Sequence, residues 1–336
     1  MAGPVPAPGS GPSGGPSGLE ALLAGDQATL ARALSHLERG GPDAEHLAAQ
    51  LRSHAGRALV VGFTGPPGAG KSSLIASFVA TLQERGERVA VVAVDPSSPV
   101  TGGALLGDRT RMGAHSVDPG VYIRSVASRG QSGGLARSIP GMIDALDAAG
   151  WPFIVLETVG SGQSDIEVIE FADVGVLLSV PGLGDDIQAL KAGMLELADI
   201  LVVNKSDLPG ADTTARHLER MLTLRANGSG GPRRPAVIRT STVVPEGVAS
   251  LLDAVEAAAG EPDRAGAGAR VARRLRRALV RGLEDEFAAR LGQLDEVRIE
   301  ELCAEVLKGG RSLHEVIGAV LAELTGVTGP SGGGVR

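Results

Sequence analysis

The sequence predicts an α/β fold, in which a mostly parallel β-sheet lies between two layers of helices and further helices precede and follow it. From residue 57 onward, short runs rich in Val, Ile and Leu alternate with amphipathic stretches, which is typical of parallel strands joined by helices. Each apolar run is continuous, as a strand covered on both faces requires. The 336 residues are 43% hydrophobic, which suffices for one large core with helical additions.

The apolar runs locate seven strands, and the amphipathic runs locate the helices. The predicted strands cover residues 58–63, 88–94, 121–125, 153–157, 174–180, 200–204 and 236–240. The predicted helices cover residues 19–39, 43–54, 71–85, 137–149, 187–198, 213–225, 246–259, 271–291, 294–307 and 312–324. Pro140 is expected to kink or begin its helix. Residues 227–235 combine glycine, serine and proline and are expected to form a surface loop.

Composition excludes several classes of function. A net charge of −7 and an aromatic content of 2% argue against nucleic-acid binding, which needs a basic surface and often stacking side chains. The single cysteine, Cys303, excludes an internal disulfide and a zinc site built on paired cysteines. Residues 1–18 carry no charged side chain, and no apolar run reaches the roughly 18 residues of a membrane span. We therefore expect a cytoplasmic protein.

Residues 65–72 form the first motif that carries chemistry, with the sequence Gly-Pro-Pro-Gly-Ala-Gly-Lys-Ser. They follow a predicted strand and open a predicted helix, which is the context of a phosphate-binding loop. Backbone N–H groups and the positive helix N-terminus would bind the phosphates. Lys71 would reach the β- and γ-phosphates, and Ser72 would hold Mg²⁺. The predicted nucleotide-binding residues of this P-loop are Gly65, Pro66, Pro67, Gly68, Ala69, Gly70, Lys71, Ser72 and Ser73.

Residues 204–207 form the second motif, Asn-Lys-Ser-Asp, directly after another predicted strand. Asp207 would accept hydrogen bonds from both N–H donors of guanine, a pair that adenine does not present. Asn204 would hold the loop together, the Lys205 stem would cover the base, and the Ser241 backbone N–H would donate to the guanine oxygen. An ordinary loop turn is the alternative interpretation. Lys71 and Lys205 are two of only four lysines among 32 basic residues, so a compact ammonium is expected to matter there.

Acidic residues at or near the ends of predicted strands complete the candidate site. Asp95, Asp108 and Glu157 are expected to converge on the metal and the γ-phosphate, because parallel strands deliver such side chains to one edge. The N–H of Gly160 would sense the γ-phosphate. Alternatively, Asp95 begins a turn before proline, and Asp108 only caps a helix. Glu157 has no such alternative, because a carboxylate that ends a buried strand needs a cation or donors.

The catalytic machinery looks incomplete in the sequence. Ser161 stands directly after Gly160, where a water-orienting glutamine is familiar, and Gln163 comes two residues later. We therefore expect slow intrinsic hydrolysis that a partner accelerates. The glycine-rich residues 181–191, which include Lys191, could swing over the nucleotide.

The last helices carry a local cluster of arginines at positions 270, 273, 274, 276, 277 and 281. A solvated face or a partner-facing ridge is the favoured interpretation, with a nucleic-acid or membrane patch as the alternative. Leu275, Ala278, Leu279 and Leu283 recur at helical spacing, and the simplest use of this apolar stripe is packing on a second subunit.

With these motifs in view, the chain resembles the cobalamin-enzyme chaperone GTPases of the MeaB, ArgK and methylmalonic aciduria type A group over residues 19–324. The resemblance rests on residues 62–72, 95–112, 157–160, 162–164, 181–186 and 204–207. Residues 95–112 are the most specific, because other P-loop GTPases lack this run. Ser73, Ser161, Asp165 and Thr242 depart from the family pattern without removing a nucleotide ligand.

The resemblance implies a P-loop NTPase fold, GTP and Mg²⁺ as ligands, and roles for particular residues. Asp95, Asp108 and Glu157 correspond to acidic switch residues around the metal, and Lys191 corresponds to a lysine in a loop that answers the partner. It also implies homodimerisation through the C-terminal helices. The implied partner is an adenosylcobalamin-dependent acyl-CoA mutase, most often methylmalonyl-CoA mutase, whose cofactor loading is gated and which is protected from inactivation.

The implied organisation is a leader (1–18), an N-terminal helical extension (19–56), a GTPase domain (57–262), a dimerisation arm (263–327) and a tail (328–336). Two other functions fit a P-loop. A metal-delivery GTPase for a nickel or cobalt enzyme would want clustered histidines or paired cysteines, whereas the six histidines here are scattered. A kinase acting on a transport protein would need a second substrate pocket and would not need Asp207.

Overall fold

A computed structural model describes residues 18–95, 118–127, 134–158, 169–182, 198–228, 235–244, 246–260 and 266–325. Asp108, Gly160, Ser161, Gln163 and Lys191 lie outside these ranges, as does nearly all of the helix predicted over 187–198. Only the backbone of Asp95 is described. Among the described helices, none has both the length and the apolar character needed to cross a membrane.

The described strands form one seven-stranded sheet in which every neighbouring pair is parallel. The strands are β1 (Leu59–Thr64), β2 (Val89–Asp95), β3 (Val121–Ala127), β4 (Phe153–Thr158), β5 (Val174–Ser179), β6 (Ile200–Val203) and β7 (Ala236–Arg239). Their spatial order is β3-β2-β4-β1-β5-β6-β7. The chain adds β2, β3 and β4 on one side of β1 and β5, β6 and β7 on the other side. Open parallel sheets bind ligands at the carboxyl end of the strand where the connections change sides in this way.

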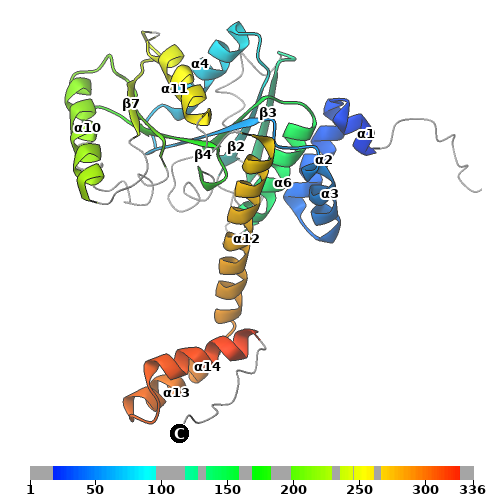
Figure 1. Ribbon diagram of the computed structural model, residues 1–336, viewed down its shortest axis with the longest axis vertical. Coiled ribbons are helices and arrows are strands. Elements are labelled where there is room, and N and C mark those ends of the chain that lie inside the picture. Colours follow the sequence, from blue (N-terminus) through cyan, green and yellow to red (C-terminus); the bar gives the residue numbers. More distant parts are fainter. Residues whose placement is uncertain are drawn as a thin grey trace, which may run out of the picture. The chain divides into compact units, whose positions relative to one another are not determined.

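Helices cover both faces of the sheet. α4 (Lys71–Glu84) and α11 (Val248–Ala259) contact each other on one face (Figure 1), where they close an apolar core that includes Phe63 and Leu178. α10 (Ala211–Gly228) packs against Leu177 and β6. Successive side chains of a strand point to opposite faces, so α10 lies on the other face from α4 and α11. The predicted α/β fold is therefore confirmed.

Three short helices at the N-terminal end of the described chain pack on α6 (Gly134–Ala148). They are α1 (Gly18–Leu23), α2 (Gln27–Arg39) and α3 (Pro42–Arg52). The single helix predicted over 19–39 is wrong, because Asp26 caps a new helix by accepting a hydrogen bond from Thr29 N–H at 2.7 Å. Pro140 lies inside α6 and does not begin it. Glu246 lies in a bridge to Ser241 before α11, and not in the helix.

Buried aspartates hold the chain where strands begin, at the edge of the sheet opposite the ligand-binding edge. Asp173 accepts from Val60 N–H at 3.1 Å, and Asp199 accepts from Gly175 N–H at 2.9 Å. Asp147 on α6 accepts from three successive N–H groups, those of residues 56–58. These carboxylates satisfy donors that would otherwise be buried without a partner.

The described chain falls into two compact units, which divide between Leu275 and Arg276. The second unit contains the rest of α12 (Ala267–Leu291) together with α13 (Glu296–Leu307) and α14 (Leu313–Thr325). Within it α13 contacts α14, and the Arg290 guanidinium donates to the Leu324 carbonyl at 2.7 Å.

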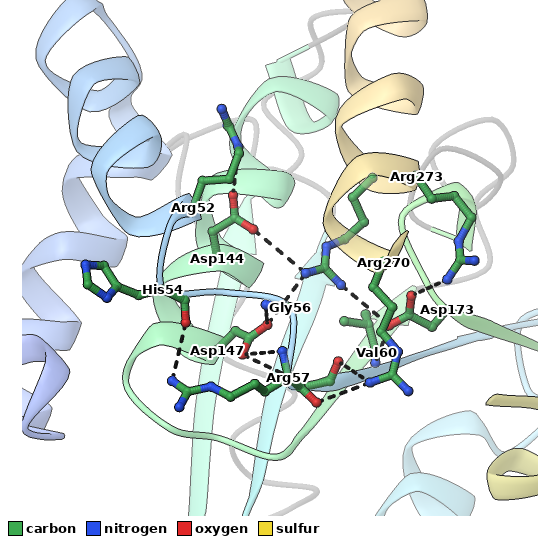
Figure 2. Close-up of polar contacts among 12 residues, drawn as sticks. Arg52, His54, Gly56, Arg57, Val60, Asp144, Asp147, Asp173, Arg270 and Arg273 are labelled. Atoms are coloured by element: carbon green, nitrogen blue, oxygen red, sulfur yellow. Dashed lines mark hydrogen bonds and ion pairs between the residues drawn. The ribbon is translucent and has the colours of Figure 1, made fainter. Parts of the chain in front are cut away.

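The first turns of α12 belong to the first unit, and three of their arginines contact its buried groups. Arg274 is only 3% exposed and lies among buried aspartates. Arg273 donates to Asp173, and Arg270 donates to the carbonyls of residues 57 and 58 (Figure 2). The expectation of a solvated or partner-facing ridge is therefore wrong for these three positions. The buried carboxylates that pair with Arg273 and Arg274 are distant from them in the sequence.

The only tryptophan and the only tyrosine of the chain meet at the same edge as the aspartates. Trp151, just before β4, is buried, and its ring centroid lies 5.9 Å from that of Tyr122 in β3. The Arg88 guanidinium lies 5.0 Å from the Trp151 ring and donates to the Gly150 carbonyl. The cation–π contact joins the beginnings of β2 and β4, and the contact between the two rings adds the beginning of β3.

The buried Asp144 carboxyl is expected to make the free energy of unfolding larger at acidic pH than at neutral pH. Burial raises the pKa of this α6 carboxyl to about 6, against the attraction of Arg274 and Arg52 and with repulsion from Asp147. Because the folded-state pKa exceeds the ordinary value of 3.8, the native state holds more protons between pH 4 and 6, and stability falls as pH rises through this window.

The substitution Asp144→Asn removes this titrating group. Relative to the variant, the wild type is expected to gain up to roughly 2–3 kcal/mol of unfolding free energy as pH falls from 7 to 4. Urea unfolding of both proteins at several pH values measures the difference. A constant difference across the range would contradict the assignment.

Candidate functional site

The P-loop joins the central strand β1 to helix α4. Gly70 precedes the helix with a φ of 86°, and the Leu74 N–H donates to its carbonyl at 2.9 Å, which begins the helical hydrogen-bond pattern. Pro67 and Gly68 are exposed at the tip of the loop, whereas Ala69 is buried. The N-terminus of a 14-residue helix therefore opens at the carboxyl edge of the sheet, where it favours an anion.

Lys71 is the first residue of α4 and is 7% exposed. Its ammonium donates to the carbonyl oxygens of Gly65 at 2.7 Å and Pro66 at 3.1 Å. These contacts hold the positive charge beside the loop backbone, within reach of a phosphate that the loop would bind.

Ser72 and Glu157 meet at the start of α4. The Ser72 hydroxyl donates to Glu157 Oε1 at 2.5 Å, and Glu157 is 4% exposed at the end of β4, the strand next to β1. A hydroxyl and a carboxylate are the hard oxygen donors that Mg²⁺ takes in nucleotide sites, so these two residues fit the predicted metal. The Asp95 backbone ends β2 on the other side of β4, but its side chain and Asp108 lie outside the described residues.

The Asn-Lys-Ser-Asp loop is tied directly to the P-loop. The Asn204 side chain donates to the Ala69 carbonyl at 2.8 Å, and Lys205 Nζ donates to the Gly68 carbonyl at 2.9 Å. A Cβ at Gly70 would lie 2.6 Å from Asn204 Nδ2, so only glycine permits this approach. The two sequence motifs are therefore in direct contact.

Asp207 is exposed at the tip of this loop, but a hydrogen bond from a buried residue holds its carboxylate in place. Asp207 Oδ1 accepts from the hydroxyl of Ser241 at 2.5 Å, and Ser241 is fully buried. The Ser241 oxygen in turn accepts from the N–H groups of Val243 and Val244, each at 3.2 Å. The second carboxylate oxygen has no hydrogen bond to the described residues, which leaves Asp207 an acceptor at the surface.

Ser241 serves the site through its hydroxyl, and its backbone N–H has another partner. That N–H donates to the Glu246 carbonyl at 3.1 Å. The adjacent Thr242 N–H has no hydrogen bond within the described turn of residues 241–244. The backbone N–H of Ser241 for which the sequence predicts a contact with the guanine oxygen therefore already has a partner in this structure.

Thr240 is a site residue that sequence reasoning missed. It is fully buried at the end of β7, and its hydroxyl donates to Asn204 Oδ1 at 3.0 Å while its carbonyl accepts from Ser206 N–H at 2.9 Å. Thr158 similarly ties the end of β4 to β1 through the Thr64 hydroxyl at 3.3 Å. A lone threonine at a strand end gives no recognisable signal in a single sequence.

The chain is similar in sequence and in fold to known proteins. The family model for methylmalonyl-CoA mutase-associated GTPase MeaB matches residues 30–293. A putative GTPase of Pyrococcus abyssi is 44% identical over 239 residues, which cover 71% of this chain and 74% of that protein. The GTPase ArgK of Escherichia coli is 38% identical over 242 residues, covering 70% and 72% of the two chains.

A mitochondrial mouse protein, the methylmalonic aciduria type A homolog, is 42% identical over 197 residues, which cover 57% of this chain and 47% of that protein. The crystal structure of an LAO/AO transport system kinase superposes with a TM-score of 0.66 at 25% identity, covering 92% of this chain and 95% of that one. The chain therefore belongs to the MeaB family of methylmalonyl-CoA mutase-associated GTPases.

Proposed function

We propose that this GTPase gates the loading of adenosylcobalamin into an acyl-CoA mutase, with methylmalonyl-CoA mutase as the first candidate, and protects that mutase from inactivation. The observation that carries the nucleotide part is the Asn204 side chain, which joins the guanine loop to the Ala69 carbonyl of the P-loop. The partner is supported by the family, which is named for its association with this mutase. We also propose that the protein acts in the cytoplasm, as the sequence predicts.

The described side chains suit the successive parts of GTP. Asp207 would accept from the guanine N1–H and N2–H, with the Thr242 N–H donating to the base oxygen. Lys71 would leave the loop carbonyls and contact the β- and γ-phosphates, since both are within reach of one flexible side chain. Ser72 and Glu157 would hold Mg²⁺, which neutralises the phosphate charge that develops during phosphoryl transfer.

The remaining roles are proposed for residues outside the described side chains. Asp95 and Asp108 would hold the water shell of the metal, the Gly160 N–H would bind the γ-phosphate, and Lys191 would respond to the mutase. Because Ser161 replaces the familiar water-orienting glutamine, hydrolysis by the isolated protein would be slow. Acceleration would come from the partner.

Homodimerisation is proposed for the second unit. Its part of α12 exposes large apolar side chains at four-residue spacing, including Leu279 at 61%, Leu283 at 62% and Phe287 at 37%. A row of this kind on a helix is stabilised when another apolar surface covers it. A second copy of the same helix offers a complementary surface, as closed two-fold assemblies require.

The test combines single-turnover GTP hydrolysis with size-exclusion chromatography and light scattering. The expected rate rises by about tenfold or more when apo-methylmalonyl-CoA mutase is added, by analogy with partner-stimulated GTPases. Light scattering is expected to report two copies of the GTPase, alone and with the mutase. Lys71→Ala is the control and should show no stimulation.

Equal hydrolysis rates with and without the mutase would sink the gating proposal. A single copy at micromolar concentration would sink the dimer proposal independently of it. Absence of GTP binding by the wild type would remove both the hydrolysis mechanism and the gating.

A further inference from the structure

Arg274 lies at the centre of a buried charge cluster at the edge of the sheet opposite the nucleotide site, and Figure 2 labels the three aspartates around it. Its guanidinium lies 3.5 Å from Asp173, 3.6 Å from Asp147 and 3.9 Å from Asp144, and the three carboxylate side chains are 1–4% exposed. Arg273 adds a hydrogen bond of 2.9 Å to the other oxygen of Asp173. The first turns of α12 therefore supply positive charge to three buried carboxylates.

Asp173 connects this cluster to the two strands that carry the phosphate site. It directly precedes β5, its carboxylate accepts from Val60 N–H at 3.1 Å, and its own N–H donates to the Val60 carbonyl at 2.7 Å. Val60 lies in β1, which leads four residues later to Thr64 and then to the P-loop. A displacement of Asp173 would therefore change its contacts with β1 and with α12 at the same time.

The residues just before Asp173 are held tightly against β1. A Cβ placed on Gly62 would lie 3.0 Å from Ala172 Cβ and 3.1 Å from Ile169 Cγ1, so this segment and the strand are in direct contact. In the sequence, residues 169–173 follow the Glu157–Gly160 motif, for which we propose contact with the metal and the γ-phosphate. In the structure, this segment contacts β1 through Ile169 and Ala172, and contacts the arginines of α12 through Asp173.

We propose that residues 169–173 and the Asp173–Arg273–Arg274 contacts couple nucleotide binding in the P-loop to the start of helix α12. Buried ions must keep their partners when the backbone around them shifts, because an uncompensated buried charge is strongly unfavourable. A nucleotide-dependent shift of this segment would thus move, tighten or release the first turns of α12. By thermodynamic linkage, weakening these contacts would also change the affinity for nucleotide.

This inference rests on the proposed binding of guanine nucleotides, and the experiment separates the two. Hydrogen–deuterium exchange of residues 267–275 is measured in the full-length protein with and without GDP and Mg²⁺, and GDP affinity is measured by calorimetry. In the wild type, GDP is expected to change the exchange rate of these amides by about threefold or more.

We call residues 169–173 and the Asp173–Arg273–Arg274 contacts the relay. Two substitutions, Asp173→Asn and Arg273→Ala, weaken it at different points. Each is expected to change the Kd for GDP by roughly three- to tenfold and to remove the response of residues 267–275 to GDP. Arg276→Ala is the matched control, because this exposed arginine of the same helix makes no hydrogen bond or ion pair with the described residues. It should leave both quantities unchanged.

The outcomes discriminate between coupling and simple structural support. If the variants melt at lower temperature but bind GDP like the wild type, the contacts only support the fold and the relay is wrong. If the wild type binds GDP without any exchange response in residues 267–275, the relay is also wrong, whether or not a variant folds. If the wild type does not bind GDP, the proposed function itself fails.

Discussion

Replacing Asp207 with asparagine is expected to weaken GDP binding by roughly 10²- to 10³-fold and to create a preference for xanthosine diphosphate. The carboxylate can accept from both the N1–H and the N2–H of guanine, whereas an amide presents one acceptor and one donor. Xanthine presents an N1–H donor beside a C2 carbonyl acceptor, which matches the amide. Calorimetric titration of wild type and variant with both diphosphates measures the reversal.

The hydrogen bond from Ser241 allows this change of preference to be attributed to the base contact and not to a rearranged loop. In the variant Asp207→Asn, the Ser241 hydroxyl can still donate to the amide oxygen of the new side chain, so the loop should keep its geometry. Asp253→Asn is the control, because this exposed carboxylate pairs with Arg85 at the surface between α4 and α11. Unchanged GDP affinity in Asp207→Asn would show that the loop does not read guanine.

Replacing Arg274 with methionine is expected to destabilise the first compact unit by about 3–5 kcal/mol. Methionine preserves much of the side-chain volume but leaves Asp144, Asp147 and Asp173 buried together without their common cation. Protonation of Asp144 would relieve part of the penalty, so the loss is expected to shrink at lower pH. Urea unfolding, followed by far-UV circular dichroism at pH 7 and pH 5, measures both effects.

Arg85→Met is the comparison for this experiment. Arg85 pairs with Asp253 and Glu256 on the exposed surface between α4 and α11, where solvent screens an ion pair and leaves it little weight in stability. A loss in Arg274→Met no larger than that in Arg85→Met would mean that the buried cluster contributes little to stability.

The strands and the nucleotide motifs could be read from the sequence because each depends on local information. Strands such as β5 are continuous apolar runs, and the P-loop is recognisable from its glycine spacing and Lys71. Local patterns also place the Asn-Lys-Ser-Asp motif after β6, where the parallel topology brings Asn204 and Lys205 to the P-loop. The joining of the two motifs follows from fold class alone.

What the sequence could not provide depends on contacts between distant residues. The arginines of α12 look like any basic helix until α6 and the start of β5 supply Asp144, Asp147 and Asp173. The break between α1 and α2 depends on Asp26 acting as a cap, which a continuous helical pattern conceals. The role of Ser241 depends on the partner of its backbone N–H, which is the Glu246 carbonyl, so that only its hydroxyl contacts Asp207.

The position of Trp151 has a practical consequence for studying this protein in solution. As the only indole of the chain, it is enclosed near Tyr122 and Arg88 where strands begin, whereas Asp207 and the P-loop follow strand ends. A nucleotide bound at those strand ends cannot touch it. After correction for light absorbed by the nucleotide, a change in its emission on addition of ligand would therefore be an intrinsic optical signal of a structural change transmitted across the protein from the strand ends.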